Sequence, residues 1–249
     1  MYQEFAYLYD KLMKNVDYQR WADCIERIFE KNGRKPKTIV DLACGTGTIT
    51  NILASRGYHM IGVDISEDML FVAGEKARKS GLKISYICQD MTELTLHQPV
   101  DAIICMCDGF NYILEDEKLK EAFQRIHRYL NPGGILVFDI STYYKLSSIL
   151  GNNTMADNDN EISLIWFNNF DRQTRILEMN LTFFEKKDGF YKRTDEIHYQ
   201  RAYYTEEIIT LLEKSGFSNI SVYSANELKP AGKRSHRVFF SATVKNIFE

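Results

Sequence analysis

The stretch that decides the fold reads Val40-Asp41-Leu42-Ala43-Cys44-Gly45-Thr46-Gly47. Its apolar first half, which begins near Thr38, is typical of a buried strand, whereas its second half consists of small residues. Such residues let the backbone pass close to a ligand, and Gly45 and Gly47 can adopt conformations that are closed to other residues. A Gly-x-Gly pair also occurs in plain tight turns. Its position directly after a strand favours a ligand site, because ligands of open α/β sheets bind at the carboxyl ends of the strands.

Further apolar runs follow, with helix-like segments between them. Ser66 has the character of an N-cap for one such helix, and Asn131-Pro132-Gly133-Gly134 ends another. Near-continuous apolar strands that alternate with helices predict a parallel sheet covered on both faces. The predicted strands are 38–42, 59–64, 84–88, 102–105 and 135–138.

The pattern changes near Ser141, where the apolar period becomes two. Apolar and polar residues alternate over 177–183 and 191–203, with the turn Lys187-Asp188-Gly189 between them, which predicts an antiparallel hairpin. We expect 162–167 to add a third strand, and the polar segment 152–160 to be a mobile loop.

Near the end of the chain the sequence again predicts a helix and apolar strands, as in the first half. A helix begins at Thr205 and is followed by two strands, 220–223 and 238–244, with no helix between them, which predicts an antiparallel sheet edge. The sequence therefore divides into one domain made of residues 1–140 and 205–249, and an inserted antiparallel subdomain of residues 141–204.

The composition excludes several classes of protein. The 249 residues are 45% hydrophobic and 26% charged, with a formal net charge of −3, the balance of an ordinary globular protein. We expect no nucleic-acid partner, because the densest basic stretch, 229–237, is short. No apolar run approaches the roughly 20 residues that cross a bilayer. The first residues also lack a signal-peptide pattern, so we expect a cytoplasmic location and no membrane partner.

One cysteine pair resembles half of a metal site. The run Cys105-Met106-Cys107 has neither a second cysteine pair nor a His-x-x-x-His partner, so we interpret it as a buried strand and assign no metal. The chain has five cysteines, and we expect them to be reduced.

Acidic residues stand at the ends of the second and third predicted strands. Asp64 is placed to accept hydrogen bonds from both hydroxyls of a ribose. Asp90 and the adjacent Met91 offer a carboxylate and an apolar side chain, which suit the amino group and the flat face of an adenine. Either acid alone could simply complement a helix macrodipole, but together, in strand order, they favour a nucleoside site.

The motifs as a set resemble the class I S-adenosylmethionine-dependent methyltransferases of small-molecule type. The resemblance is close over about residues 2–139, and it implies a Rossmann-like α/β fold. That fold has a seven-stranded, mainly parallel sheet with an antiparallel final strand and an inserted antiparallel β lid. The segment 5–10 resembles the amino-terminal helix that closes over the cofactor in such enzymes. The motifs are Asp41 to Gly47, Gly62-Val63-Asp64-Ile65-Ser66 with Met69-Leu70, Gln89-Asp90-Met91, and Leu130 to Gly134.

The resemblance implies S-adenosylmethionine as the cofactor and assigns residues to its parts. Tyr9 and Trp21 would belong to the lid, although aromatic residues in an amphipathic helix also serve as core, and Trp21 shares a face with Ile25. The other assignments are Asp41, Ala43, Cys44, Gly45 and Gly47 for the methionine portion, Asp64 for the ribose, Ile65, Asp90 and Met91 for the adenine, Asp108 and Asn111 for the region of the sulfonium, and Met69 and Cys107 as further cofactor contacts.

The acceptor side is expected to involve Tyr9, His198 and Arg201. Methyl transfer from a sulfonium depends mainly on alignment of donor and acceptor, so a strong catalytic base is not required for every acceptor. His198 and Arg201 fall on opposite faces of one predicted strand, and only one of the faces can line the pocket. Arg201 would suit an acidic acceptor group, but a solvated strand whose charges protect an edge explains both residues equally well.

Two other functions share parts of this pattern. A nicotinamide-dependent oxidoreductase has a similar strand, glycine loop and acidic residue, but Thr50 stands where its fingerprint needs a third small residue. A noncatalytic module that binds S-adenosylmethionine, or another protein, is the second alternative. The expected enzyme takes a small-molecule acceptor, with N, O or carboxylate acceptors left open, as a monomer or homodimer.

Overall fold

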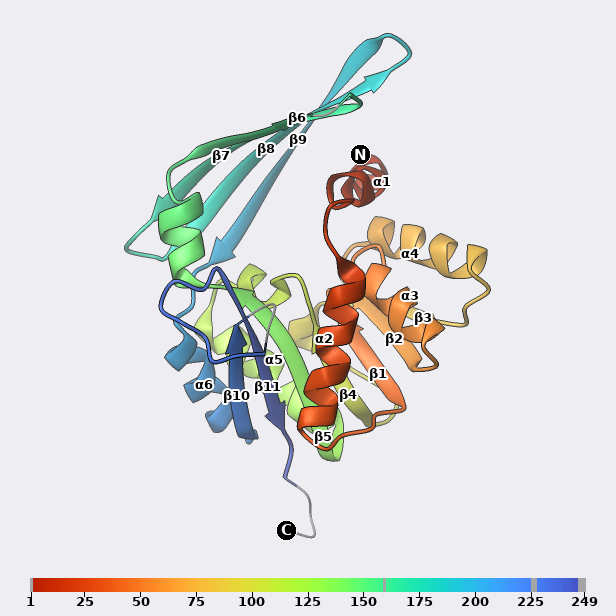
Figure 1. The fold of residues 1–249 in the computed structure, drawn as a ribbon, viewed down its shortest axis with the longest axis vertical. Coiled ribbons are helices and arrows are strands. Elements are labelled where there is room, and N and C mark those ends of the chain that lie inside the picture. Colours follow the sequence, from red (N-terminus) through yellow and green to blue (C-terminus); the bar gives the residue numbers. More distant parts are fainter. Residues whose placement is uncertain (1, 159, 225–227, 246–249) are drawn as a thin grey trace.

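The computed structural model describes residues 2–158, 160–224 and 228–245, with side chains from Ala6 onward. A seven-stranded sheet in the order β10-β11-β5-β4-β1-β2-β3 lies beside a separate four-stranded sheet in the order β6-β7-β8-β9 (Figure 1). The predicted α/β fold with an antiparallel insertion is thus confirmed. The α-helices are α1 (Tyr2–Leu12), α2 (Tyr18–Lys31), α3 (Thr48–Ser55), α4 (Glu67–Lys79), α5 (Asp116–Tyr129) and α6 (Thr205–Lys214), and the short helices are η1 (Met91–Glu93), η2 (Gly109–Tyr112) and η3 (Lys145–Leu150). The strands are β1 (Thr38–Leu42), β2 (His59–Asp64), β3 (Ser85–Cys88), β4 (Val100–Cys105), β5 (Leu130–Ser141), β6 (Thr154–Asn158), β7 (Ile162–Asp171), β8 (Ile176–Lys187), β9 (Phe190–Arg201), β10 (Ser218–Ser224) and β11 (Arg237–Thr243).

The larger sheet is buried on both faces. β1 pairs in parallel with β2 and β4, and its side chains alternate between two apolar layers. Val40 belongs to the same buried cluster as Phe123 of α5, whereas Ile39 belongs to the cluster of Ile25 of α2 and Leu53 of α3. This burial explains why the strand is apolar at successive positions rather than at every second one.

The end of the chain enters the sheet rather than extending its edge. β11 lies between β5 and β10 and runs antiparallel to both. The expected antiparallel pair is therefore present, and β10 forms the sheet edge.

The smaller sheet contains one strand more than predicted. The expected mobile loop 152–160 contains β6, which pairs antiparallel with β7, although residue 159 lies outside the described residues. The prediction was wrong because β6 is an edge strand whose residues are nearly all exposed, so it shows no apolar alternation. Its order comes from the backbone hydrogen bonds to β7.

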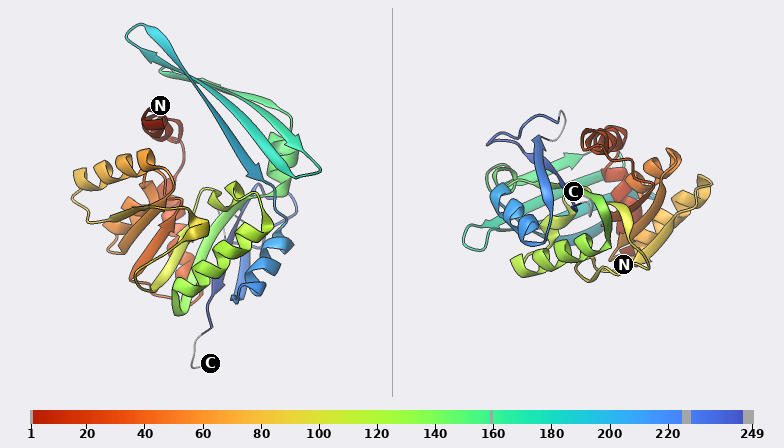
Figure 2. Two further views of the ribbon diagram at one scale, coloured as in Figure 1. Left: turned by 180° about the vertical axis from the view of Figure 1, so that it is seen from behind. Right: turned by 90° about the horizontal axis from the view of Figure 1, so that it is seen from below.

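The smaller sheet projects beyond the carboxyl ends of the parallel strands, and α1 lies between it and α4 (Figures 1 and 2). Side chains tie α1 to both neighbours. Lys11 forms an ion pair with Glu185 of β8, with 2.8 Å between Nζ and Oε1. Tyr7 donates a 3.2 Å hydrogen bond to Glu75 of α4. The edge of the main sheet at the carboxyl ends of its parallel strands is therefore covered by β6–β9 and flanked by α1.

Candidate active site

The loop after β1 requires glycine at two positions for different reasons. Gly47 is the N-cap of α3 at a φ of +71°, and a Cβ there would lie 2.6 Å from the Tyr86 hydroxyl and 2.9 Å from the Ala73 Cβ. Gly45 has a φ of +55°, but a Cβ there would have no neighbour within 4 Å among the described residues. The space beside Gly45 is open, which leaves room for a ligand against the backbone.

Asp41, at the end of β1, is hydrogen-bonded to the helix that follows this loop. Its side chain is only 2% exposed and accepts a 2.6 Å hydrogen bond from the Thr50 hydroxyl. Burial raises the pKa of Asp41 to about 7, although the bond from Thr50 opposes this shift. Asp41 therefore carries a carboxyl group that titrates near neutral pH at the floor of the site.

Asp64 connects the end of β2 to the same loop. Its Oδ2 accepts a 2.8 Å bond from the Gly45 backbone N–H, and its Oδ1 accepts a 2.9 Å bond from the Ser66 N–H. Burial raises its pKa, although these backbone bonds oppose the shift. Each carboxylate oxygen has a second lone pair, so Asp64 can still accept hydrogen bonds from a ligand.

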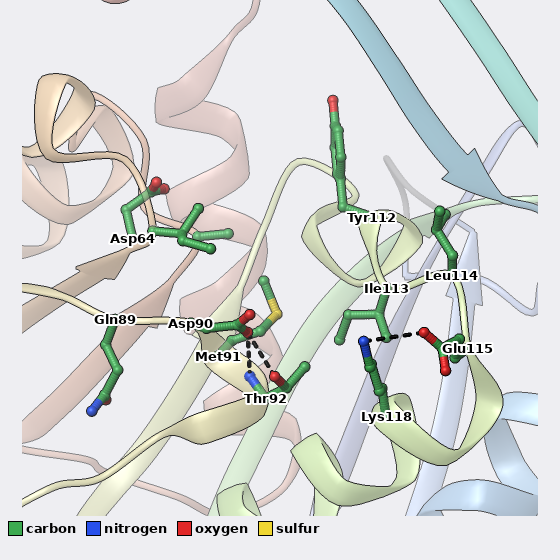
Figure 3. A pocket seen from close by; sticks show the side chains of 12 residues that line it. Asp64, Gln89, Asp90, Met91, Thr92, Tyr112, Ile113, Leu114, Glu115 and Lys118 are labelled. Carbon is green, nitrogen blue, oxygen red and sulfur yellow. Dashed lines mark hydrogen bonds and ion pairs between the residues drawn. The ribbon is translucent and has the colours of Figure 1, made fainter. Parts of the chain in front are cut away.

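A cavity of about 340 Å³ opens beside Asp64. Figure 3 shows Asp64 and Asp90 entering it from the ends of neighbouring strands, while Tyr112 projects from η2 on the other side. Asp90 is held by its own turn, where its Oδ1 accepts 2.8 Å bonds from the backbone N–H and hydroxyl of Thr92. The lining residues are Ala43, Asp64, Ile65, Gln89, Asp90, Met91, Thr92, Tyr112, Ile113, Leu114, Glu115 and Lys118.

A smaller cavity of about 40 Å³ lies on the other side of Ala43. Asp10 ties α1 to the wall of this cavity, because its carboxylate accepts a 2.6 Å bond from the hydroxyl of the lining residue Thr46 and a 2.8 Å bond from the Lys76 ammonium. Predicted residues gather here from three segments of the chain. The lining residues are Tyr9, Tyr18, Asp41, Ala43, Cys44, Gly45, Thr46, Thr48, Ile49, Met106 and Cys107.

A third cavity, of about 400 Å³, lies between the main sheet and the inner face of β6–β9. Tyr9 and Cys107 line both it and the small cavity, and Tyr112 lines both it and the cavity beside Asp64. Its walls are mainly apolar, and one end is polar. The lining residues are Tyr9, Leu12, Met13, Val16, Trp21, Cys107, Asp108, Tyr112, Lys145, Leu150, Asp157, Leu164, Trp166, Met179, Leu181, Phe183, His198, Gln200 and Arg237.

A buried ion cluster forms the polar end of the third cavity. Arg237 pairs with Asp108, with 2.7 Å between Nη2 and Oδ1, and with Asp139. Asp108 also accepts a 2.8 Å bond from the Gln200 amide. Burial alone would raise the pKa of Asp108, but the charges of Arg237 and Lys145 and the bond from Gln200 together outweigh it, and the pKa falls to about 2. For Asp139 burial prevails and raises the pKa to about 6.

The two faces of β9 are now distinguished. His198 and Gln200 face the third cavity, and His198 Nδ1 lies 3.3 Å from the Tyr112 hydroxyl. Burial lowers the pKa of His198, so its ring is neutral at pH 7. Arg201 instead donates a 2.8 Å bond to the Leu114 carbonyl and pairs with Asp116. The expectation that Arg201 faces an acceptor is therefore wrong, because its parity directs it to α5.

Two other expected contacts have different surroundings. Asn111 is fully buried, donates to the backbone carbonyls of Ser141 and Arg201, and accepts from the Ser141 N–H. This corrects its expected place beside a sulfonium, because its amide joins the ends of β5 and β9. Met69 packs with Leu8 in the apolar cluster under α1 and does not line any of the three cavities described.

Comparison with known proteins identifies the chemistry. A sequence model described as "Methyltransferase domain" matches residues 39–134. YqeM of Bacillus subtilis (strain 168) is 37% identical over 245 residues that cover 97% of this chain and 96% of that protein. Its name describes it as a methyltransferase. An S-adenosylmethionine-dependent methyltransferase from Clostridium acetobutylicum ATCC 824 is 36% identical, with a TM-score of 0.90 and coverage of 98% of this chain and 99% of that chain. This chain belongs to the S-adenosylmethionine-dependent methyltransferases.

A more distant solved structure shares the fold alone. The methyltransferase has a TM-score of 0.74 and 18% identity to CalS10 of Micromonospora echinaspora, an amino pentose methyltransferase solved with its S-adenosylmethionine, over 95% of each chain. The cofactor of the family is S-adenosylmethionine, as expected from the sequence. The residues present fit this cofactor, because the first cavity holds free acceptor positions on Asp64 and the space beside Gly45 is open.

The sequence predicted only Asp108 of the ion cluster of the methyltransferase, and it missed Asp139, Arg237 and the neighbouring Lys145. Asp139 and Lys145 follow the rule that site residues gather at the carboxyl ends of parallel strands, since β5 ends at Ser141. Arg237 begins β11, which runs antiparallel to β5, so the amino end of β11 reaches the same edge. Arg237 could have been found from the prediction of an antiparallel final strand, because the first residues of such a strand lie at the edge where the parallel strands end.

The described part of the methyltransferase has neither the group of side chains that a metal site requires nor a helix of the kind that spans a membrane. Within residues 2–158, 160–224 and 228–245, no group of three or more His, Cys, Asp or Glu side chains is placed to hold a metal ion. Over the same ranges, none of the helices is both long and apolar enough to span a bilayer.

Proposed function

We propose that this methyltransferase acts on a small-molecule acceptor that binds in the third cavity. The observation that carries the proposal is the shared lining of the three cavities. Ala43 joins the first to the second, and Tyr9 and Cys107 join the second to the third. A donor extended along the first two cavities would therefore present its reactive end to the third.

The donor side of the proposal follows from the cavity walls. We assign the ribose to Asp64 and the adenine to Ile65, Asp90 and Met91. Ile65 is 68% exposed, so its side chain is available to cover a planar base. The methionine portion is assigned to the loop of Ala43, Cys44, Gly45 and Gly47 above Asp41, with Tyr9 and Cys107 at the boundary of the acceptor cavity.

The acceptor side works mainly by alignment. S-adenosylmethionine supplies an activated methyl group, so the chain has to hold the acceptor in line and exclude water. Trp21 and Trp166 line the apolar walls, whereas Tyr9 and His198 are assigned to contact the acceptor. The neutral imidazole of His198 can accept a proton from an acceptor that must lose one.

The smaller sheet is assigned as the substrate cover. Residues 141–204 form the inserted subdomain, and residues 1–140 and 205–249 form the cofactor-binding domain. Support comes from the inner face of β6–β9, which supplies Leu164, Met179 and Leu181 to the wall of the acceptor cavity. A cytoplasmic location, a monomeric or homodimeric state and the lack of a nucleic-acid partner belong to the same proposal.

A label-transfer experiment tests the proposed acceptor class. The protein is incubated with S-adenosylmethionine labelled in the methyl group and with three fractions of a bacterial extract, namely an ultrafiltrate of small molecules, protein and RNA. We expect label in the ultrafiltrate and a strong reduction with Asp64→Asn, while the matched Glu67→Gln variant on α4 retains activity. Enzyme-dependent label in protein or RNA alone would contradict a small-molecule acceptor.

A further inference from the structure

The third cavity, proposed to hold the acceptor, has apolar walls and a cluster of charged residues at one end. Its walls are aliphatic, aromatic and thioether side chains, contributed by the segment around α1 and by the inner face of the smaller sheet. Its charged lining residues are Asp108, Lys145, Asp157 and Arg237. Three of these four belong to the ion cluster at one end, and Asp157 enters from β6. The cavity therefore fits a molecule with an apolar body and a polar group at one end.

The cations at the polar end differ in how much they are already used. Arg237 is committed to two carboxylates, those of Asp108 and Asp139. Lys145 begins η3, and among the described residues its ammonium has one hydrogen-bond partner, the Ser141 hydroxyl at 3.0 Å. An ammonium carries three donors. Lys145 is therefore the cation that can still offer hydrogen bonds to a ligand in this cavity.

Asp139 is a carboxyl group that can be neutralised by a proton when another negative charge enters the cavity. Its side chain is fully buried, and within the described part of the chain its Oδ1 has no hydrogen-bond partner. The charged groups that face it are Arg237 from β11, Asp108 from the segment before η2, and Lys145 from η3. The thiols of Cys105 and Cys107 also face it, and burial raises their pKa, so they stay neutral. Asp139 can take up a proton at Oδ1 without breaking a bond.

We propose that the acceptor of this methyltransferase is an apolar carboxylic acid whose carboxylate is bound by Lys145 at the polar end of the third cavity. The proposal rests on the proposed function, because it takes the third cavity as the acceptor site. Lys145 acts as the specificity-determining residue, since the paired Arg237 contributes little net positive charge. Asp139 acts as a positioning residue, and its protonation offsets the charge of the entering carboxylate.

Binding of three matched probes tests the acceptor class. The protein is saturated with S-adenosylhomocysteine and titrated by calorimetry with 4-phenylbutanoate, 4-phenylbutylamine and 4-phenylbutanol, which share one apolar body. We expect the acid to bind at least about tenfold more tightly than the amine and the alcohol, which corresponds to one charge-assisted hydrogen bond. Tighter binding of the amine or the alcohol, or binding of none of the probes, would overturn the proposal.

Variants assign the preference to one side chain. Lys145→Met keeps an unbranched side chain that is one atom shorter and removes its charge, so it should abolish the preference for the acid. Its affinity for S-adenosylhomocysteine should be unchanged, since Lys145 does not line the first two cavities. Lys120→Met is the matched control, because Lys120 lies on α5 and pairs with Glu117 away from the cavities. Retention of the acid preference by Lys145→Met would overturn the role of Lys145.

The pH dependence of binding supplies a measurement that needs no Lys145 variant. The pKa of Asp139 is about 6 without a ligand, and an entering anion would raise it further. The complex therefore binds more protons, so the affinity for 4-phenylbutanoate should rise as pH falls from about 8 to 6, while a simple carboxylic acid stays ionised. Asp139→Asn cannot take up this proton and should flatten the profile. An equally steep profile in Asp139→Asn would overturn the role of Asp139.

These binding experiments are independent of methyl transfer. A failure of the acid preference would leave label transfer to the small-molecule fraction intact, and only the acceptor class would be wrong. Label in protein or RNA alone would refute the proposed function whatever the probes show.

Discussion

Asp64 and Gly45 are joined by a 2.8 Å hydrogen bond from the Gly45 backbone N–H to Asp64 Oδ2. The bond ties the carboxyl end of β2 to the loop that follows β1, so the ribose candidate and the methionine loop form one unit. Any change at Asp64 therefore acts on both halves of the donor site.

Replacement of Asp64 should weaken cofactor binding. Asp64→Ala removes the acceptors proposed for the ribose hydroxyls and releases the Gly45 N–H. Charge-assisted hydrogen bonds contribute about 1.5–3 kcal/mol each, so the Kd for S-adenosylhomocysteine should rise by roughly ten- to a hundredfold or more. Calorimetric titration measures this, with Glu67→Gln in the first turn of α4 as the control. An unchanged Kd for Asp64→Ala would remove the central assignment of the donor site.

The two loop glycines should differ in their tolerance of alanine. Gly45→Ala adds only the strain of a positive φ, about 1–2 kcal/mol. Gly47→Ala adds the same strain and also places a Cβ against Tyr86 and Ala73, so it should lower the free energy of unfolding by more. Urea denaturation of both variants gives the comparison. Equal decreases in the free energy of unfolding would show that Tyr86 moves away from the added Cβ without an energetic penalty.

Asp41 should make the protein less stable as pH rises. Its folded pKa of about 7 lies above the unfolded value near 3.9, so the folded state binds more protons between these limits. The contribution of Asp41 to the free energy of unfolding therefore falls as pH increases from about 4 to 7. Asp41→Asn keeps an acceptor for Thr50 and should remove this slope, measured by urea midpoints across that range. A slope identical to that of the unmodified protein would contradict the assignment.

Removal of Arg237 should be far more costly than removal of a surface arginine. Arg237→Met leaves Asp108 and Asp139 as buried carboxylates without their cation, and breaking such a pair costs about 3–5 kcal/mol. Arg193→Met breaks a solvent-exposed pair with Asp195, which is worth about 0–1 kcal/mol. Thermal or urea unfolding distinguishes the two variants. Similar losses would mean that water or a rearranged carboxylate compensates in the cluster.

The two faces of β9 should separate catalysis from stability. His198→Gln should lower kcat/KM for the acceptor by at least about tenfold while S-adenosylhomocysteine affinity is retained. Arg201→Met should leave the kinetics unchanged and cost about 1–3 kcal/mol of stability, because it loses the Leu114 and Asp116 contacts. Steady-state kinetics combined with urea unfolding tests both variants. An acceptor KM that rises only in Arg201→Met would reverse the orientation of the strand.

The main sheet could be predicted because its signals are local. The apolar run before Asp41 and the glycines after it identify a buried strand and its loop without knowledge of any partner. The order of Asp64 and Asp90 along the chain predicted a nucleoside site, and the identity of the cofactor was implied by the resemblance of the motifs to the methyltransferase family. β6 escaped prediction because an exposed edge strand takes its order from a neighbour rather than from its own side chains.

The acceptor side could be predicted only in part, because it depends on pairing between distant segments. The parity of β9 placed His198 and Arg201 on opposite faces, but the sequence contains nothing that says which face turns inward. Asn111 was assigned to the region of the sulfonium through the resemblance to the family, whereas its amide bonds the backbones of β5 and β9. Arg237 and Asp139 meet across 98 residues of chain, a separation that no local pattern reports.

The position of β11 inside the sheet has a consequence for biosynthesis. Of the seven described strands of this sheet, the strand that separates β10 from β5 is the last to be synthesised, and its first residue, Arg237, completes the charge balance of the acceptor cavity. Until that strand has left the ribosome, β5 presents an unpaired apolar edge, which is a template for association with other chains. Premature termination upstream of Arg237 should thus yield aggregating polypeptide rather than a weakened enzyme, and nascent chains should depend on chaperones until β11 has been made.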